Sequence, residues 1–146
     1  MLKKEKILDA DISLYRRFYS NEEAKKIFNI LKEEIVWKQI KVKLFGKEYL
    51  SPRLSAWYGI KPYKYSGYKW EQKACPDIII KIKKDIENLT ALKFNGVLVN
   101  LYRNGEDSMG WHSDNEKELG KKPIIASIVF GDTRRFLLRE KKIKKN

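Results

Sequence analysis

The sequence has few of the residue types that build disulfides and metal sites. Among 146 residues there is one cysteine, Cys75, and one histidine, His112. A single cysteine excludes an internal disulfide framework and a cysteine-based zinc site, and it favours a reducing compartment. No apolar run approaches the roughly 18 residues that a membrane span needs, and the N-terminus lacks the apolar stretch of a signal peptide. We therefore expect a soluble intracellular protein of the nucleus or cytoplasm.

Acidic residues are also scarce, with 19 Asp and Glu against 32 Lys and Arg, which gives a formal net charge of +13. This excess favours a polyanionic partner, most simply DNA or RNA, with an anionic membrane surface as the weaker option. A well-solvated surface without a polyanionic partner is the alternative. The length fits one domain with its own core, and we expect residues 1–146 to form a single monomeric domain.

Two helices are predicted from apolar residues at helical spacing. The first follows Ser20-Asn21-Glu22-Glu23 and runs to about Ile35. In this capping box Ser20 and Glu23 each bond to the other's backbone N–H group. The second begins at Cys75-Pro76-Asp77, with Pro76 at the first helical position. Residues 1–19 are expected to be a lead-in that docks apolar side chains on a core.

Most of the remaining chain favours β-structure. A hairpin is predicted around Phe45-Gly46-Lys47, with Gly46 in the turn. A strand over 54–58 and a loop over 59–67 are expected to follow. Further strands are predicted over 94–103, 124–130 and 133–139, and Trp111–Asp114 is predicted to be a short extended piece.

The segment from Lys41 to Lys73 combines eight basic and eight aromatic residues with two acidic ones. Basic side chains neutralise phosphates, and flat rings stack on exposed bases at roughly 1–3 kcal/mol each, so this composition suits nucleic acid. Trp57 and Tyr58 are instead expected in the core of their strand. Phe45, Tyr63 and Tyr65 are expected to be exposed.

His112 and Asp114 stand two positions apart, and residues two apart in an extended chain project from the same face. A converging imidazole and carboxylate are two of the three ligands in a 2-His-1-carboxylate Fe(II) site. The second histidine of such a site is missing from the sequence. A purely structural histidine is therefore the alternative interpretation.

Several motifs then occur in a characteristic order. They are Phe45-Gly46-Lys47, Pro52 to Gly59, Pro62 to Gly67, Asn100 to Asn104, Trp111 to Glu116, and Pro123 to Gly131 with Arg134. This series resembles the AlkB family of Fe(II)- and 2-oxoglutarate-dependent dioxygenases, and most of all its eukaryotic nucleic-acid demethylases. The resemblance covers roughly residues 35–139.

The resemblance implies an α+β fold in which two N-terminal helices flank the sheets of a double-stranded β-helix, or jelly-roll, core. It implies Fe(II), 2-oxoglutarate and O2 as cofactors and co-substrates. The implied activity is repair of alkylated DNA or RNA by oxidative demethylation of a base, which releases formaldehyde, succinate and CO2. A methyl group inside a base stack is out of reach of a buried metal, so the base has to be flipped out.

By the same resemblance, His112 and Asp114 are the iron ligands and catalytic residues. Contacts to 2-oxoglutarate are implied for Leu98, Asn100 and Tyr102. Substrate contacts are implied for Phe45, Gly46 and Lys47 in the hairpin, for Tyr63, Lys64 and Tyr65 around the flipped base, and for Asn115 and Glu116. Asn115 departs from the family, which often has aspartate there. An amide lacks the negative charge that favours a cationic methylated base.

The resemblance ends at about Arg139. In the family, the final iron histidine and the arginines that pair with the 2-oxoglutarate carboxylate lie in later strands. We therefore expect a domain truncated at its C-terminal end, with weak iron binding and little turnover. The alternatives are a catalytically impaired or inactive nucleic-acid-binding remnant and, less favoured, a related dioxygenase that acts on protein or small molecules.

Overall fold

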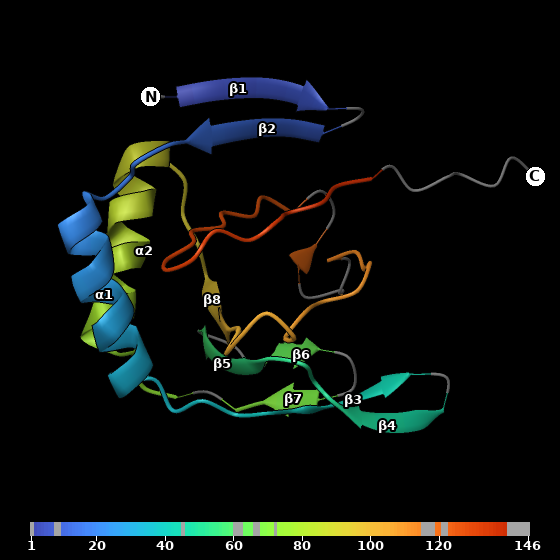
Figure 1. Cartoon of the computed structure of the whole chain (residues 1–146). Helices are drawn as coiled ribbons and strands as arrows, with labels where there is room; N and C mark the ends of the chain where they lie inside the picture. Colours follow the sequence, from blue (N-terminus) through green and yellow to red (C-terminus); the bar gives the residue numbers. More distant parts are fainter. Residues whose placement is uncertain are drawn as a thin grey trace, which may run out of the picture. The chain divides into compact units, whose positions relative to one another are not determined.

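The computed structural model of the chain describes residues 2–7, 10–44, 46–59, 63–65, 68–71, 73–114, 119–120 and 123–139. These residues contain two helices and eight strands, and the strands form four antiparallel pairs (Figure 1). Contacts divide the chain into two compact units. One comprises Leu31–Ser127, and the other comprises Met1–Ile30 and Ile128–Asn146.

The N-terminal segment, expected to be a lead-in, forms a hairpin. β1 (Leu2–Ile7) pairs with β2 (Ala10–Tyr15), in a register that runs from Leu2↔Tyr15 to Ile7↔Ala10. The sequence signal lies in β2, where apolar residues at positions 10, 12 and 14 alternate with polar ones. That period of two is typical of a strand.

Helix α1 (Asn21–Glu34) begins at the predicted capping box. The Glu23 backbone N donates to Ser20 Oγ at 3.2 Å, and the Ser20 backbone N donates to Glu23 Oε2 at 3.1 Å. Ile27, Leu31 and Ile35 are buried at the i, i+4 spacing of one helix face. The first predicted helix is therefore confirmed in its start, its length and its apolar face.

Two hairpins lie in the Leu31–Ser127 unit. β3 (Lys41–Leu44) and β4 (Lys47–Leu50) form the predicted hairpin, with Gly46 at a φ of +79° in the turn. β6 (Tyr63–Tyr65) and β7 (Tyr68–Trp70) form a second hairpin, which corrects the loop expected over 59–67. Aromatic residues at alternate positions favour strands, and this preference prevails here over the neighbouring turn residues.

The central pair of this unit joins β5 (Leu54–Gly59) to β8 (Gly96–Leu101), in a register from Leu54↔Leu101 to Gly59↔Gly96. The predicted strands at 54–58 and within 94–103 are thereby confirmed. The Trp57 ring lies over both glycines, and a Cβ atom at either position would collide with it. The indole can therefore lie against the sheet because neither of these two positions carries a side chain.

The core of the unit contains Ile40 and Trp70, which are 4% and 5% exposed. Trp57 is partly buried against them, and Tyr58 is itself buried. The expectation that Trp57 and Tyr58 belong to the core is confirmed. Burial also raises the pKa of the Tyr58 hydroxyl above its usual value.

Helix α2 (Asp77–Thr90) buries Ile79 and Ile82. Pro76 is the N-cap and not the first helical residue, because its ψ of 146° is extended. Its carbonyl accepts hydrogen bonds from the backbone N atoms of Ile79 (3.0 Å) and Ile80 (3.1 Å).

Neither helix among the described residues has the length and apolar character that crossing a membrane requires.

The segment 123–139 contains no strand, so the strands predicted over 124–130 and 133–139 are wrong. Apolar side chains of this segment are exposed, with Val129 at 70% and Phe136 at 77%. A strand needs a neighbour that pairs with its N–H and C=O groups, and the four described strand pairs do not include this segment. The described residues therefore do not show the expected jelly-roll core.

A buried carboxylate holds the end of α2. The Glu87 side chain is 7% exposed and accepts hydrogen bonds from Lys83 Nζ (2.7 Å) and the Phe94 backbone N (2.8 Å). These two bonds, with smaller attractions from the charges of Lys83 and Lys93, lower the pKa of Glu87 to about 2. They connect the last turn of α2 to the chain that leads into β8.

Glu87 should make the stability of the chain depend on pH. Its stabilising contribution is fully present above the unfolded-state pKa of about 4.3 and is lost as the pH falls through about 2. We predict that Glu87→Gln lowers the free energy of unfolding at neutral pH, and that the difference from wild type shrinks between about pH 4.5 and pH 2.

Urea unfolding at a series of pH values measures this difference. Glu33→Gln, which removes an exposed carboxylate from α1, is the matched control and should leave the pH dependence unchanged. A difference between wild type and Glu87→Gln that stays constant over the whole pH range contradicts the prediction.

Candidate metal centre and the donor residues of β8

The two residues of the His-x-Asp motif lie together in the structure. His112 Nε2 is 3.6 Å from Asp114 Oδ1, and both side chains are 42% exposed. His112 Nδ1 is 2.8 Å from the carbonyl oxygen of Gly110. A carbonyl oxygen only accepts, so Nδ1 carries a proton, and Nε2 is the ring nitrogen that lies near the Asp114 carboxylate. The predicted convergence of the two side chains is confirmed.

This pair has the chemistry of two metal ligands. Imidazole nitrogen and carboxylate oxygen bind first-row metals at about 2.0–2.2 Å, so two neighbouring ligand atoms lie about 3 Å apart. The separation of 3.6 Å is close to that value. The Nδ1–H bond to a backbone carbonyl is also the usual outer contact of a metal-binding histidine. Within the described ranges, no group of three or more His, Cys, Asp or Glu could hold a metal ion.

Asn100 and Tyr102 meet polar side chains from the β5 segment. Ser55 Oγ donates to Asn100 Oδ1 at 2.9 Å, and Arg53 Nη1 donates to the Tyr102 hydroxyl at 3.1 Å. Ser55 is 2% exposed and Arg53 6%. The predicted polar face is therefore matched by a buried hydroxyl on β5 and a buried guanidinium one residue before β5.

The loop between β8 and His112 is held by a second buried carboxylate. Asp107 accepts three hydrogen bonds of 2.8 Å from Arg103, one from its backbone N and two from its guanidinium. These hydrogen bonds raise the pKa of Arg103 above its ordinary value. Asn104 Oδ1 accepts from the backbone N atoms of Glu106 (3.0 Å) and Asp107 (3.3 Å). This segment is thus a tightly bonded loop.

Two further contacts attach this loop to the rest of the Leu31–Ser127 unit. The Ser108 backbone N donates to the Pro52 carbonyl at 3.1 Å, next to Arg53. Met109 packs against the core of Ile40 and Trp70. The chain therefore returns to the beginning of β5 before it reaches His112.

Other predicted site residues lie elsewhere or outside the described ranges. Leu98 faces Trp57 in the register of β5 and β8. Gly46 and Lys47 form the turn and the start of β4, and Lys47 is exposed. Tyr63, Lys64 and Tyr65 make up β6. Phe45, Asn115 and Glu116 are outside the part of the chain that the structure describes.

The sequence interpretation did not single out Arg53, Ser55, Arg103 or Asp107 as parts of the site. Arg53 and Ser55 have the same spacing of two as Asn100 and Tyr102, which is a sequence signal for one face of a strand. Their pairing with β8 depends on the strand register, which the sequence does not specify. Arg103 and Asp107 stand four residues apart, a spacing that in a loop predicts no contact.

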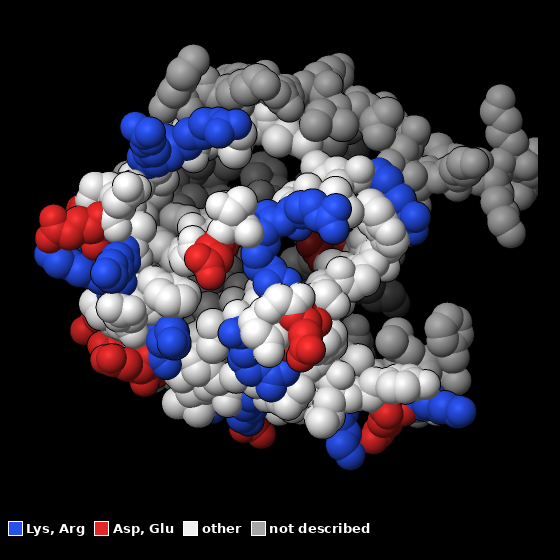
Figure 2. Space-filling view, in the orientation of Figure 1, with Lys and Arg blue, Asp and Glu red and all other residues white. Residues whose placement is uncertain are grey.

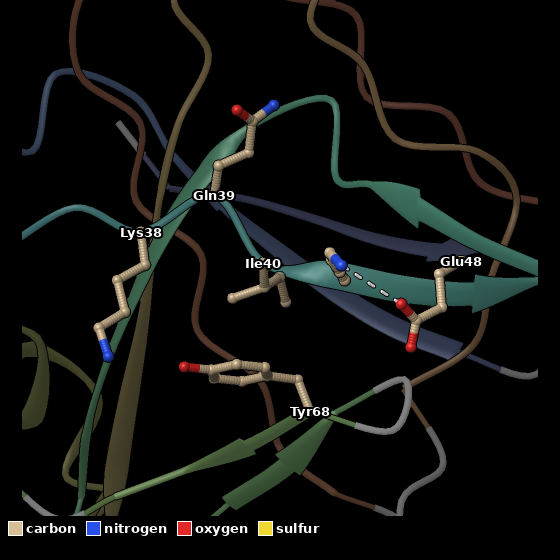
Figure 3. A pocket seen from close by; sticks show the side chains of 6 residues that line it. Lys38, Gln39, Ile40, Glu48 and Tyr68 are labelled. Carbon is tan, nitrogen blue, oxygen red and sulfur yellow. Dashed lines mark hydrogen bonds and ion pairs between the residues drawn. The ribbon is translucent and has the colours of Figure 1, made fainter.

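An open cleft of about 520 Å³ lies beside β3, β4 and β7, between residues 38–40 and the basic and aromatic segment. Ile40 and the Tyr68 ring face each other across it, with Lys38 on one side and the Lys41–Glu48 ion pair on the other (Figure 3). Gln39 completes its lining. Figure 2 shows basic side chains interspersed with acidic ones on the face in view.

The chain is similar to several curated proteins over most of its length. The chain is 43% identical to the alpha-ketoglutarate-dependent dioxygenase alkB homolog 3 of Homo sapiens over 131 residues, which are 89% of this chain and 46% of that protein. The same protein of Bos taurus is 43% identical over 85% of this chain and 44% of its own length. The DNA oxidative demethylase ALKBH2 of Mus musculus is 36% identical over 87% of this chain and 55% of its own length.

The chain thus spans about half the length of the curated relatives it matches. A family model described as the 2OG-Fe(II) oxygenase superfamily matches residues 11–146. This match covers nearly all of the sequence, and the chain therefore belongs to the 2OG-Fe(II) oxygenase superfamily.

Proposed function

We propose that the chain contributes to Fe(II)- and 2-oxoglutarate-dependent oxidative demethylation of alkylated bases in DNA or RNA. The observation that carries this proposal is the His112–Asp114 pair, with Nε2 aimed at the carboxylate and Nδ1 held by Gly110. The dioxygenase and demethylase names of relatives at 36–43% identity support the same chemistry. In the whole protein, β5 and β8 would belong to a jelly-roll core.

In this proposal His112 Nε2 and the Asp114 carboxylate bind Fe(II), and Leu98, Asn100 and Tyr102 contact 2-oxoglutarate. When bound, iron with 2-oxoglutarate and O2 supplies the oxidising chemistry that hydroxylates an N-methyl group, with loss of succinate and CO2. The hydroxymethyl product releases formaldehyde and leaves the unmodified base. The protein groups hold the co-substrate and keep the imidazole in the Nδ1–H form that binds metal.

The proposed substrate surface is the basic and aromatic segment together with Lys38, which precedes it. Lys38 and Lys41 would bind phosphates beside the Tyr68 ring in the cleft of Figure 3. Phe45, Gly46 and Lys47 would enter the base stack from the hairpin tip, and the strand Tyr63–Tyr65 would line the flipped base. Asn115 and Glu116 would contact that base after the iron aspartate.

A second candidate function is nucleic-acid binding without turnover. The observation that favours it is the single histidine of the sequence, which limits this chain to one imidazole ligand. The net charge of +13 serves this function equally well.

We predict weak binding of a divalent metal that depends on both proposed ligands. His112→Ala and Asp114→Ala should each reduce Mn(II) affinity by more than the roughly 10–100-fold that loss of an outer contact costs. Isothermal titration calorimetry measures this affinity. Asp132→Ala, which removes an exposed carboxylate, is the control and should bind like wild type. Equal affinities in all four proteins would falsify the assignment.

Turnover distinguishes the two candidate functions. Given an oligonucleotide with 1-methyladenine or 3-methylcytosine, the chain should release a small amount of formaldehyde and succinate, dependent on Fe(II) and abolished by His112→Ala. Little turnover is expected because the sequence supplies one imidazole. Complete absence of product favours the non-catalytic function, and rapid turnover contradicts the expectation that one histidine limits activity.

Oligonucleotide binding should depend on salt and on the cleft. Lys38→Ala should weaken binding and reduce the slope of log K against log salt by about 0.7, the value for one single-strand phosphate contact. Lys84→Ala, which removes an exposed lysine of α2, should leave the slope unchanged. Fluorescence anisotropy measures both, and an equal effect of the two substitutions rules out the cleft as a specific phosphate contact.

A further inference from the structure

Ser55 is bound through both its backbone and its side chain. Its backbone N donates to the Lys38 carbonyl at 2.8 Å, and its own carbonyl accepts from the Lys38 backbone N at 3.0 Å. The residue as a whole is 2% exposed. Its position is therefore fixed by the Lys38 backbone on one side and by β8 on the other.

The same bonds explain why the Ser55 hydroxyl reaches Asn100. In an antiparallel ladder the N–H and C=O of one residue point to the same neighbour, and those of Ser55 point to Lys38. Ser55 and Asn100 face each other in register, so they form a pair without mutual backbone hydrogen bonds. In such pairs the Cα atoms are closest and the side chains meet.

The direction of this hydrogen bond determines what Asn100 offers to a ligand. Ser55 Oγ donates to Asn100 Oδ1 at 2.9 Å, so the amide oxygen faces β5. The Asn100 NH2 group, which can only donate, is then on the opposite side of the carboxamide. Two residues along, the Tyr102 hydroxyl accepts from the Arg53 guanidinium. A guanidinium cannot accept, so the hydroxyl proton of Tyr102 has to point elsewhere.

We propose that Ser55 is a positioning residue that fixes the Asn100 carboxamide with its NH2 group turned towards the 2-oxoglutarate site. This inference rests on the proposed function, because it takes Asn100 as a 2-oxoglutarate contact. Hydrogen-bond donors suit an anionic dicarboxylate, whereas a flipped amide would present its oxygen to a negative charge. The Ser55 hydroxyl could also accept from a flipped amide, but its own proton, in a residue that is 2% exposed, would then lose Asn100 Oδ1 as its acceptor. Removing the hydroxyl removes this preference for one orientation.

The experiment is a titration of the whole chain with 2-oxoglutarate in the presence of Zn(II), followed by NMR through the backbone and side-chain amide signals. Ser55→Ala should bind about three- to tenfold more weakly than wild type, the range expected for loss of one hydrogen bond. Ser55→Thr keeps the hydroxyl and should restore binding. Ser13→Ala, at an exposed strand serine, should bind like wild type.

A double-mutant cycle separates positioning from a general structural role. If Ser55 acts through Asn100, Ser55→Ala should weaken binding in the wild-type background but cause no further loss in Asn100→Ala. An equal loss in both backgrounds, or unchanged binding in Ser55→Ala, overturns the inference. If Ser55→Ala does not fold, Ser55→Cys, with a similar size and a weaker donor, takes its place in the cycle and should show an intermediate loss.

The wild-type titration keeps the two proposals apart. Wild-type binding together with an unaffected Ser55→Ala contradicts only the role of Ser55. Failure of the wild-type chain to bind 2-oxoglutarate contradicts the proposed function and, with it, this inference.

Discussion

The register between β5 and β8 is the constraint on which the candidate site depends. It determines that Ser55 meets Asn100 and that Arg53, one residue before β5, meets Tyr102. A shift by one residue would turn these partners to opposite faces of the sheet. The Trp57 ring opposes such a shift, because it occupies the space over the facing glycines at the other end of the pair. Packing of one indole thus helps to align polar groups several residues away.

Features of the fold that depend on neighbouring residues could be predicted from the sequence. The capping box at Ser20 and Glu23 and the turn at Gly46 are examples, because a few adjacent residues determine their bonds. The strands predicted within 123–139 show the opposite case. Their β-branched residues fit a strand, but strand formation also requires a partner with free N–H and C=O groups. Sequence periodicity contains no information about that partner.

The same distinction applies to the site. The spacing of His112 and Asp114 was sufficient to predict that their side chains meet, and the polar residues of β8 were visible as an alternating pattern. Arg53 and Ser55 reach that strand from 49 and 45 residues away in the sequence. Their role is decided by the pairing of β5, and the alternation alone is equally compatible with an exposed strand. The contact of the Asp107 carboxylate with the Arg103 guanidinium was not predicted, because loop geometry and not helical spacing brings these two side chains together.

The two halves of the proposed site differ in how firmly they are held. Asn100 and Tyr102 contact buried groups on a paired strand, whereas His112 and Asp114 are 42% exposed and follow a loop. Hydrogen-bond donors that are already held in place need little reorganisation when a molecule binds. Exposed side chains such as His112 and Asp114 must first give up the water that surrounds them. Oxidative chemistry also requires that water be kept from the reacting centre. If the pair binds metal as proposed, its chemistry depends on what covers it. In the proposed function, a nucleic acid lying over the exposed pair would both exclude water and bring a base to it.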